Sequence, residues 1–473
     1  MLRKYLSLDR NIFLLSLFLA TLAVAAMPYQ VYFAAFLIFV AAAVKYGERF
    51  LIAFVIFSYL TIPSDIGDLI RVLLNVLNFL ILGYLFLKKY GLEFNNYPVI
   101  PRSILYLIVF TVATMTMSAF FSASPVTGLI EISRTVIFLA LIYWLYSFLS
   151  DDKAVFGFIN ALLISALVIA FSMFFEFLKT DKFIFLLSSM GYVTLGGYFT
   201  NSTAVGGFLA VTISLTLLYL FMEEKSRYKF LIGMFFFLQI IALLLTDSRA
   251  AIAAAFISVM FTVFFLNRKI FKRTAAAIII MAVLLFLIPY LNTIVDNYFR
   301  VNRIFENTRY YLWEMAWGMI KDYPILGVGP GMFNHYMYTY LPVRMGSWTE
   351  QQIYVLQQIA AAPSHNFFLM RASQEGIFGL VSAVGIFFIF FSYGFRLIKI
   401  SKNISENYFI LSVGITGIGL GLLVRSFFEA TGVFTNGWIT RDLPFWLLLG
   451  ILVYIKLKIT DRAKESRLVD RYN

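Results

Sequence analysis

Apolar runs long enough to form membrane-spanning helices follow one another along almost the whole chain. A helix needs roughly 20 apolar residues to cross the hydrocarbon core of a bilayer, with about 17 as the lower limit. This pattern predicts fourteen spans, but the second and third are short and could be interfacial or re-entrant, so twelve is the alternative. The predicted spans are 11–27, 29–44, 50–63, 67–87, 103–121, 128–149, 154–178, 203–222, 229–246, 249–266, 274–293, 365–395, 407–429 and 442–458.

One long polar segment, residues 294–364, interrupts the apolar pattern. Both histidines of the chain lie in this segment or next to it. We expect amphipathic helices near 306–321 and 348–361, separated by the Gly/Pro-rich stretch 324–331. The chain therefore divides into N-terminal membrane helices (1–293), one large helical loop (294–364) and C-terminal membrane helices with a basic tail (365–473).

The composition also indicates a membrane protein. The chain is 61% hydrophobic and 13% charged, whereas soluble domains carry about a quarter charged residues. We therefore predict an all-α polytopic membrane protein. The absence of cysteine excludes disulfides, thiolate metal ligands and a thiol nucleophile. Two histidines are too few for a zinc site built mainly on imidazoles, so we expect no metal.

The basic residues predict the topology, because Lys and Arg favour the cytoplasmic side of a membrane. With a cytoplasmic N-terminus and alternating spans, essentially the whole net charge of +13 falls on the cytoplasmic side. The stretch 267–273 and the C-terminal tail are the clearest examples. This arrangement places both termini in the cytoplasm and the 294–364 loop outside, and it removes the main reason to expect nucleic-acid binding.

Ionisable residues at the predicted outer ends of the spans are the candidates for a site, because charge inside a membrane is costly. Some of them can instead be ion pairs that lock helices together. The possible pairs are Glu131 with Arg134, Arg371 with Glu375, and Arg425 with Glu429. We favour this structural interpretation for the last two pairs, whose members are four residues apart on one face of a predicted helix.

Arg249 occupies a different position, in the first turn of a predicted helix that Asp247 or Ser248 can cap. A cation is unfavourable there for the helix itself, whereas a helix N-terminus attracts anions. We expect Arg249 to bind an anion; a salt bridge to a nearby carboxylate is the alternative. Arg309, on the first helix of the loop, could make bidentate contacts to phosphate, or it could be an ordinary exposed arginine.

His365 follows Ser364, which is a good N-cap for the long helix predicted to start there. In the first turn, the positive end of the helix dipole disfavours the imidazolium, so the ring stays neutral and can act as a general base. A merely capping or interfacial histidine is the alternative. His335 lies among aromatic residues without such a context, and we interpret it as structural.

These residues suit lipid-linked glycan transfer. An outward-facing site has no nucleotides, so its substrate must already be activated in the membrane. Arginines would bind a diphosphate, grooves between helices would bind a lipid tail, and the aromatic loop would bind sugars. The GVGPG stretch at 327–331 lacks the Lys-Ser/Thr of a phosphate-binding loop, and we interpret it as a turn.

The motifs TDSRA, RYYLWEMA, PILGVGPGMF and SHNFFLMRASQEGIFGL together resemble the signature of the O-antigen ligase and O-antigen polymerase superfamily, over roughly residues 246–379. The resemblance implies a metal-independent, cofactor-free, inverting transfer of a glycan from undecaprenyl diphosphate, on the outer face of the bacterial cytoplasmic membrane. By this resemblance Arg249 and Arg309 bind the diphosphate, with Arg303 as the alternative to Arg309, and His365 activates the acceptor. Residues that could support the site are Glu375, which matches a common family position, Arg425 and Arg134.

Within the superfamily, we favour a ligase that uses lipid A core or a similar acceptor. A polymerase that joins repeat units is the alternative. A transporter or flippase for the same lipid-linked glycans is an alternative of another class. A transporter should have charged or broken helices near the middle of the membrane, and the central parts of these spans are almost free of charge.

Overall fold

The computed structural model describes residues 47–62, 68–179, 195–197, 201–223, 225–287, 309–337, 339–340, 364–435 and 439–472, and every regular element in these ranges is a helix. The helices of 18 residues or more are α4 (Asp68–Tyr90), α5 (Arg102–Phe120), α6 (Pro125–Ser147), α7 (Asp152–Lys179), α9 (Ser202–Met222), α10 (Ser226–Leu245), α11 (Arg249–Leu266), α12 (Arg268–Leu287), α17 (Phe367–Ser401), α18 (Glu406–Ser426) and α19 (Ile439–Tyr472). The shorter ones are α3 (Glu48–Leu60), the 3-10 helix η2 (Phe94–Asn96), α14 (Arg309–Asp322) and α15 (Phe333–Met337).

Ten of the long helices, all but α12, are apolar enough over a sufficient length to cross a membrane, counting only described residues. The prediction of an all-α polytopic membrane protein is confirmed. Each predicted span that falls in the described ranges coincides with a helix, and α3, at 13 residues, is as short as expected. The predicted spans 11–27 and 29–44, the end of 274–293 and the predicted helix 348–361 lie outside the described residues.

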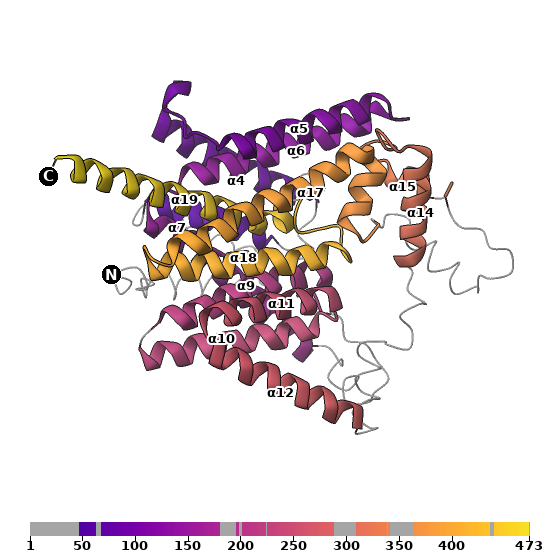
Figure 1. Ribbon diagram of the computed structural model, residues 1–473. Coiled ribbons are helices and arrows are strands. Elements are labelled where there is room, and N and C mark those ends of the chain that lie inside the picture. The colour runs from indigo at the N-terminus through magenta and orange to yellow at the C-terminus, as the bar shows by residue number, and fades with distance from the viewer. Residues whose placement is uncertain are drawn as a thin grey trace.

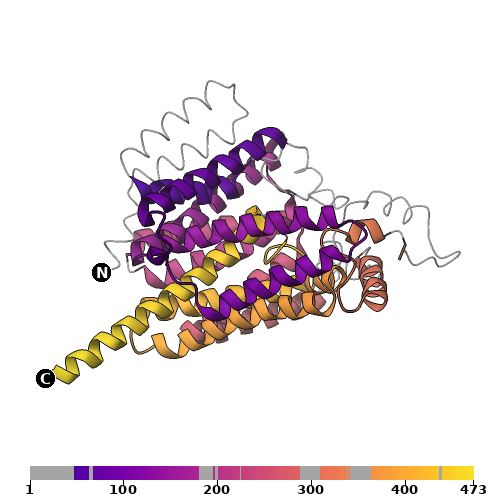
Figure 2. The same cartoon turned by 90° about the horizontal axis from the view of Figure 1, so that it is seen from above.

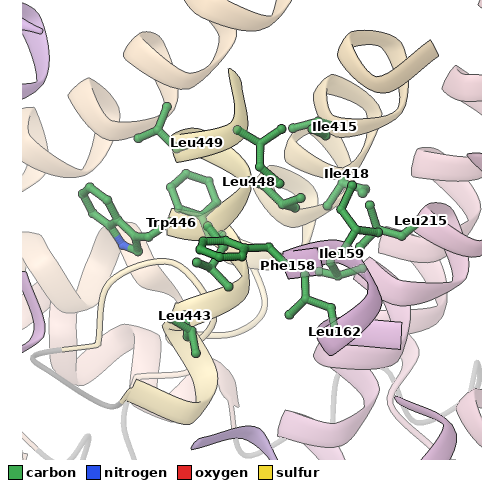
Figure 3. Packing of buried hydrophobic residues seen from close by; sticks show 14 of the residues in the cluster. Phe158, Ile159, Leu162, Leu215, Ile415, Ile418, Leu443, Trp446, Leu448 and Leu449 are labelled. Carbon is green, nitrogen blue, oxygen red and sulfur yellow. The ribbon is translucent and has the colours of Figure 1, made fainter. Parts of the chain in front are cut away.

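The helices form an inner and an outer group. In the apolar stretch of α9, 83% of the residues are buried, and in that of α18 the share is 72%, whereas it is 22% in α4 and 17% in α10. The outer helices therefore turn apolar side chains toward the lipid. The core between α7, α9, α18 and α19 consists of interlocking Ile, Leu and aromatic side chains (Figure 3).

Small residues allow α11 and α18 to pack closely. A Cβ atom on Gly421 would lie closer than 3.0 Å to Ala254 and to Ser258 of α11. The Ser258 hydroxyl also donates to the carbonyl of Gly417 at 2.9 Å. In a membrane, where lipid competes with protein for apolar contacts, such close approach is a main source of helix association. This packing fixes the start of α11 relative to the end of α18.

The Gly/Pro-rich stretch that follows α14 is attached to a break in α17. Gly376 has a positive φ of 64° inside α17, which interrupts the helical hydrogen bonds there. The N–H groups of Val328 and Gly329 donate to the freed carbonyls of Ser373 and Gln374, both at 2.9 Å. The stretch is thus a turn, as predicted, and two of its N–H groups are used to hold α14 and α15 against the bundle.

α14 and the C-terminal end of α19 lie at opposite ends of the bundle, as both views show (Figures 1 and 2). The segment that carries Arg309 is therefore far from the basic tail. This separation is what the predicted topology requires of the loop and the C-terminus.

We expect Gly421→Val to destabilise the protein, because overpacking a close helix interface costs about 1–3 kcal/mol. Gly233→Val on the outer helix α10 is the matched control, since a Cβ there meets nothing within 4 Å. Thermal unfolding of the purified protein in detergent should show a lower Tm for Gly421→Val only. Equal Tm values for the two variants would show that the α11–α18 contact is not a stabilising interface.

Candidate functional site

The Glu429 carboxylate joins two of the predicted site residues. Its Oε1 accepts from Nη2 of Arg309 at 2.5 Å, and its Oε2 lies 3.1 Å from Nδ1 of His365. The Glu429 side chain is only 3% exposed, whereas those of Arg309 and His365 are 27% and 28% exposed. The carboxylate is therefore inside the protein, and the two groups it holds reach the surface of the site.

Three segments that are distant in sequence meet at this point. Arg309 is the first residue of α14, His365 lies just before α17, and Glu429 follows the end of α18. The Asn366 side chain ties two of the segments together: its Nδ2 donates to the carbonyl of Phe427 at 3.0 Å. Trp313 of α14 packs against Phe428, with ring centroids 6.3 Å apart. These contacts hold Glu429 between its two partners.

The position of His365 differs from the prediction. We expected Ser364 to be the N-cap and His365 to lie in the first turn of the helix. Instead Asn366 is the N-cap, its side chain accepts from the N–H of Leu369 at 2.9 Å, and α17 begins at Phe367. Asn caps a helix at least as well as Ser. His365 is therefore outside the helix, with a positive φ of 49°, and its immediate partner is Glu429.

Glu429 is held in its charged form. Burial alone would raise its pKa, but the hydrogen bond from His365 and the positive charges of Arg425 and Arg309 outweigh burial, so the pKa lies below its usual value of 4.5. An ionised carboxylate can only accept hydrogen bonds. Nδ1 of His365 therefore carries a proton, and a ring with that single proton presents the Nε2 lone pair as the available base.

Arg249 lies where the sequence predicted, at the first position of α11, and Ser248 is the N-cap residue, although its side chain makes no cap hydrogen bond. Contacts of two consecutive glycines of α9 show where Arg249 lies along the length of the bundle. A Cβ on Gly206 would contact Ser248, and a Cβ on Gly207 would contact the guanidinium of Arg425. The turn that carries Arg249 is thus at the same end of the bundle as Arg425 and the segment around Glu429.

The predicted ion pair between Arg425 and Glu429 is wrong, because α18 ends at Ser426 and the two side chains do not share a helical face. Arg425 instead donates to the carbonyls of Thr431 and Thr203. Its charge still acts on Glu429, as described above. Sequence reasoning named Glu429 only as a structural partner of Arg425 and missed its contacts with Arg309 and His365. One signal was available: a carboxylate near a helix C-terminus is unfavourable for the dipole and needs cations beside it.

The other predicted pairs form. Arg371 and Glu375 make an ion pair on α17 that is almost completely buried, with side chains 2% and 0% exposed. Arg134 and Glu131 pair at 2.7 Å on α6. His335 is exposed on α15, and Arg303 lies outside the described residues. Within the described ranges, no three His, Asp or Glu side chains are grouped as metal ligands would be.

Residues 234–384 match the family model described as O-antigen ligase. This part of the chain is therefore similar to the O-antigen ligase family. The prediction of the O-antigen ligase and polymerase superfamily is confirmed, and the motif region 246–379 lies wholly within the match. The matched region includes Arg249, Arg309 and His365 but ends before Glu429. No sequence among the curated proteins matches this chain.

The lowered pKa of Glu429 predicts a pH-dependent contribution to stability. The pKa in the folded protein lies below that in the unfolded chain, so the contribution is complete above pH about 4.5 and is lost as the pH falls further, through the folded-state pKa. Glu429→Gln should therefore lower the Tm at pH 7, and the difference from wild type should shrink as the pH drops below 4.5. Glu406→Gln, at the exposed start of α18, is the control. A pH-independent difference would contradict the lowered pKa.

Proposed function

We propose that this protein transfers a glycan from undecaprenyl diphosphate to an acceptor hydroxyl at the outer face of the bacterial cytoplasmic membrane. The observation that carries the proposal is the bridge by which Glu429 holds Arg309 and His365 together. This bridge supports His365 as a base with a fixed proton position and Arg309 as a neighbouring cation for the phosphate. The similarity to O-antigen ligases supports a lipid-linked glycan as the substrate class.

His365 is the general base in this proposal. Its Nε2 takes the proton of the acceptor hydroxyl while the acceptor oxygen attacks the anomeric carbon of the donor sugar. Glu429 stabilises the imidazolium that forms and keeps the ring in one tautomer, as the carboxylate does in Ser-His-Asp triads. The proton later leaves Nε2 for solvent. Attack from the face opposite the leaving group gives inversion.

Arginines take the role that a metal has in many phosphate-transfer sites. As the bond between the anomeric carbon and the diphosphate oxygen breaks, the diphosphate keeps the electron pair and gains negative charge. Arg309 and Arg249 stabilise this charge, since preorganised cations act most strongly where charge develops in the transition state. Arg303 is the alternative to Arg309. No metal or cofactor is required in this scheme.

The orientation follows from the charges. We place the loop 294–364 and the site on the outer side, and both termini in the cytoplasm. The basic start of α12, with Arg268, Lys269, Lys272 and Arg273, supports this orientation. The opposite positions of α14 and the C-terminal end of α19 are consistent with it.

We expect His365→Ala to reduce transfer about 10²–10⁴-fold, the usual contribution of general base catalysis. The exposed His335→Ala is the matched control and should keep wild-type transfer. The assay uses the purified chain, an undecaprenyl-diphosphate oligosaccharide and candidate acceptors. Arg249→Ala should also lose transfer while the protein remains folded, and a chelator should have no effect. Transfer that survives in His365→Ala would remove the base assignment.

The choice of acceptor distinguishes the ligase from its alternatives. We expect glycan to move to lipid A core, which is the ligase reaction. Elongation of a second lipid-linked glycan instead would identify a polymerase, with the same residues in the same roles. Movement of the lipid-linked glycan across the membrane without any transfer would favour a transporter and overturn the proposal.

A further inference from the structure

Glu429 lies in a connecting segment without regular secondary structure. The segment joins α18 to α19, and its described residues, 427–435, form neither helix nor strand. The backbone groups of such a segment find their partners in other elements. The position of the Glu429 carboxylate therefore depends on those elements.

One face of α19 binds the backbone of this segment. Asp442 lies in the first turn of α19. Its Oδ1 accepts from the N–H of Gly432 at 3.1 Å and from the hydroxyl of Thr435 at 2.7 Å, and its Oδ2 accepts from the N–H of Thr435. Trp446, one turn further along α19 (Figure 3), donates from Nε1 to the carbonyl of Val433 at 2.7 Å. Since residues four apart share a helical face, this face of α19 fixes the segment from 432 to 435.

Asp442 makes three of these contacts. Its residue is 0% exposed, and both of its oxygens accept. Hydrogen bonds to an ionised carboxylate are roughly twice as strong as those between neutral groups. The positive charges of Arg425 and Arg441 act on this carboxylate, and the N-terminal end of the helix dipole also favours it. Asp442 is therefore a strong anchor for the segment.

The segment is also held on the other side of Glu429, where Asn366 donates to the carbonyl of Phe427. Glu429 thus lies between one fixed point before it and several after it. Its Oε2 is 3.1 Å from Nδ1 of His365, and a separation of about 3.6 Å is no longer a hydrogen bond. A displacement of about 0.5 Å is therefore enough to break this contact.

We propose that Asp442 is a positioning residue for the transfer reaction. By holding the backbone of 432–435, it keeps the Glu429 carboxylate against Nδ1 of His365 and so keeps the proton on that nitrogen. This inference rests on the proposed role of His365 as the base. It gives a part in the reaction to α19, which lies outside the region 234–384 that matches the O-antigen ligase family.

The test compares Asp442→Asn with Asp152→Asn in the full chain. Asn keeps the size of the side chain but loses the charge and turns N–H groups toward donors. Asp152 is the matched control, because it lies in the first turn of α7 and also accepts from two other residues, the hydroxyls of Tyr408 at 2.7 Å and Tyr454 at 2.9 Å. Tyr408 is near the start of α18, whereas Glu429 follows its end, about 30 Å away along the helix.

The first readout is nitrogen-15 NMR of His365 in a His335→Gln background, which leaves one imidazole in the chain. We expect Asp442→Asn to lose the single form protonated on Nδ1 and Asp152→Asn to keep it. In the transfer assay Asp442→Asn should lower kcat about 10–100-fold, because misplacing a group by about 1 Å can cost 10²-fold. In a Glu429→Gln background it should lower kcat by no more than about 2-fold, since both changes act through one contact.

A second pair, Thr435→Val and Thr435→Ser, decides the question if Asp442→Asn does not fold, as judged by its Tm. Val removes the hydroxyl that donates to Asp442, and Ser keeps it. We expect a changed His365 spectrum in Thr435→Val only.

A wild-type His365 spectrum in folded Asp442→Asn would overturn the positioning role, as would one in Thr435→Val where Asp442→Asn does not fold. Equal changes in Asp442→Asn and Asp152→Asn would also overturn it, because they would show a general loss of structure. Absence of transfer by the wild-type chain would overturn the proposed function instead. The spectra do not depend on transfer, so the two failures are distinguishable.

Discussion

The site depends on one buried carboxylate that has two cationic or potentially cationic partners. Glu429 is almost inaccessible to water and binds Arg309 through one oxygen and His365 through the other. Leaving a buried carboxylate uncompensated is costly, so its partners must stay in place. The same contact orients the imidazole, fixes which nitrogen carries the proton and ties the polar loop to the membrane bundle. The orientation of His365 and the packing of this region therefore depend on a single interaction.

The membrane bundle brings the three segments together by close packing at one end. Glycines and alanines let α11 and α18 approach, which sets the start of one helix against the end of the other. The break in α17 at Gly376 frees carbonyls that accept from Val328 and Gly329, and so places α14 over the bundle. The positions of Arg249, Arg309 and Glu429 thus follow from helix ends, which are the natural places for charge at a membrane surface.

The sequence predicts features set by neighbouring residues, such as helices and their caps, but not contacts between residues that are far apart in the chain. Apolar runs predict the helices because a bilayer leaves the backbone few other choices, and the capping signal ahead of Arg249 places it correctly. The start of α17 was predicted two residues early, since Ser364 and Asn366 are both good caps and only tertiary contacts, such as Asn366 with Phe427, select between them. Which residues contact Glu429 could not be predicted, because its partners are 120 and 64 residues away.

The most direct test of the account is the protonation of His365 by nitrogen-15 NMR. The chain has two histidines, so a His335→Gln background labelled at histidine leaves one imidazole to observe. We predict a neutral ring with the proton on Nδ1 and a bare Nε2, and loss of this single tautomer in Glu429→Gln. A ring protonated on Nε2, or a spectrum unchanged by Glu429→Gln, would contradict the claim that Glu429 sets up the base.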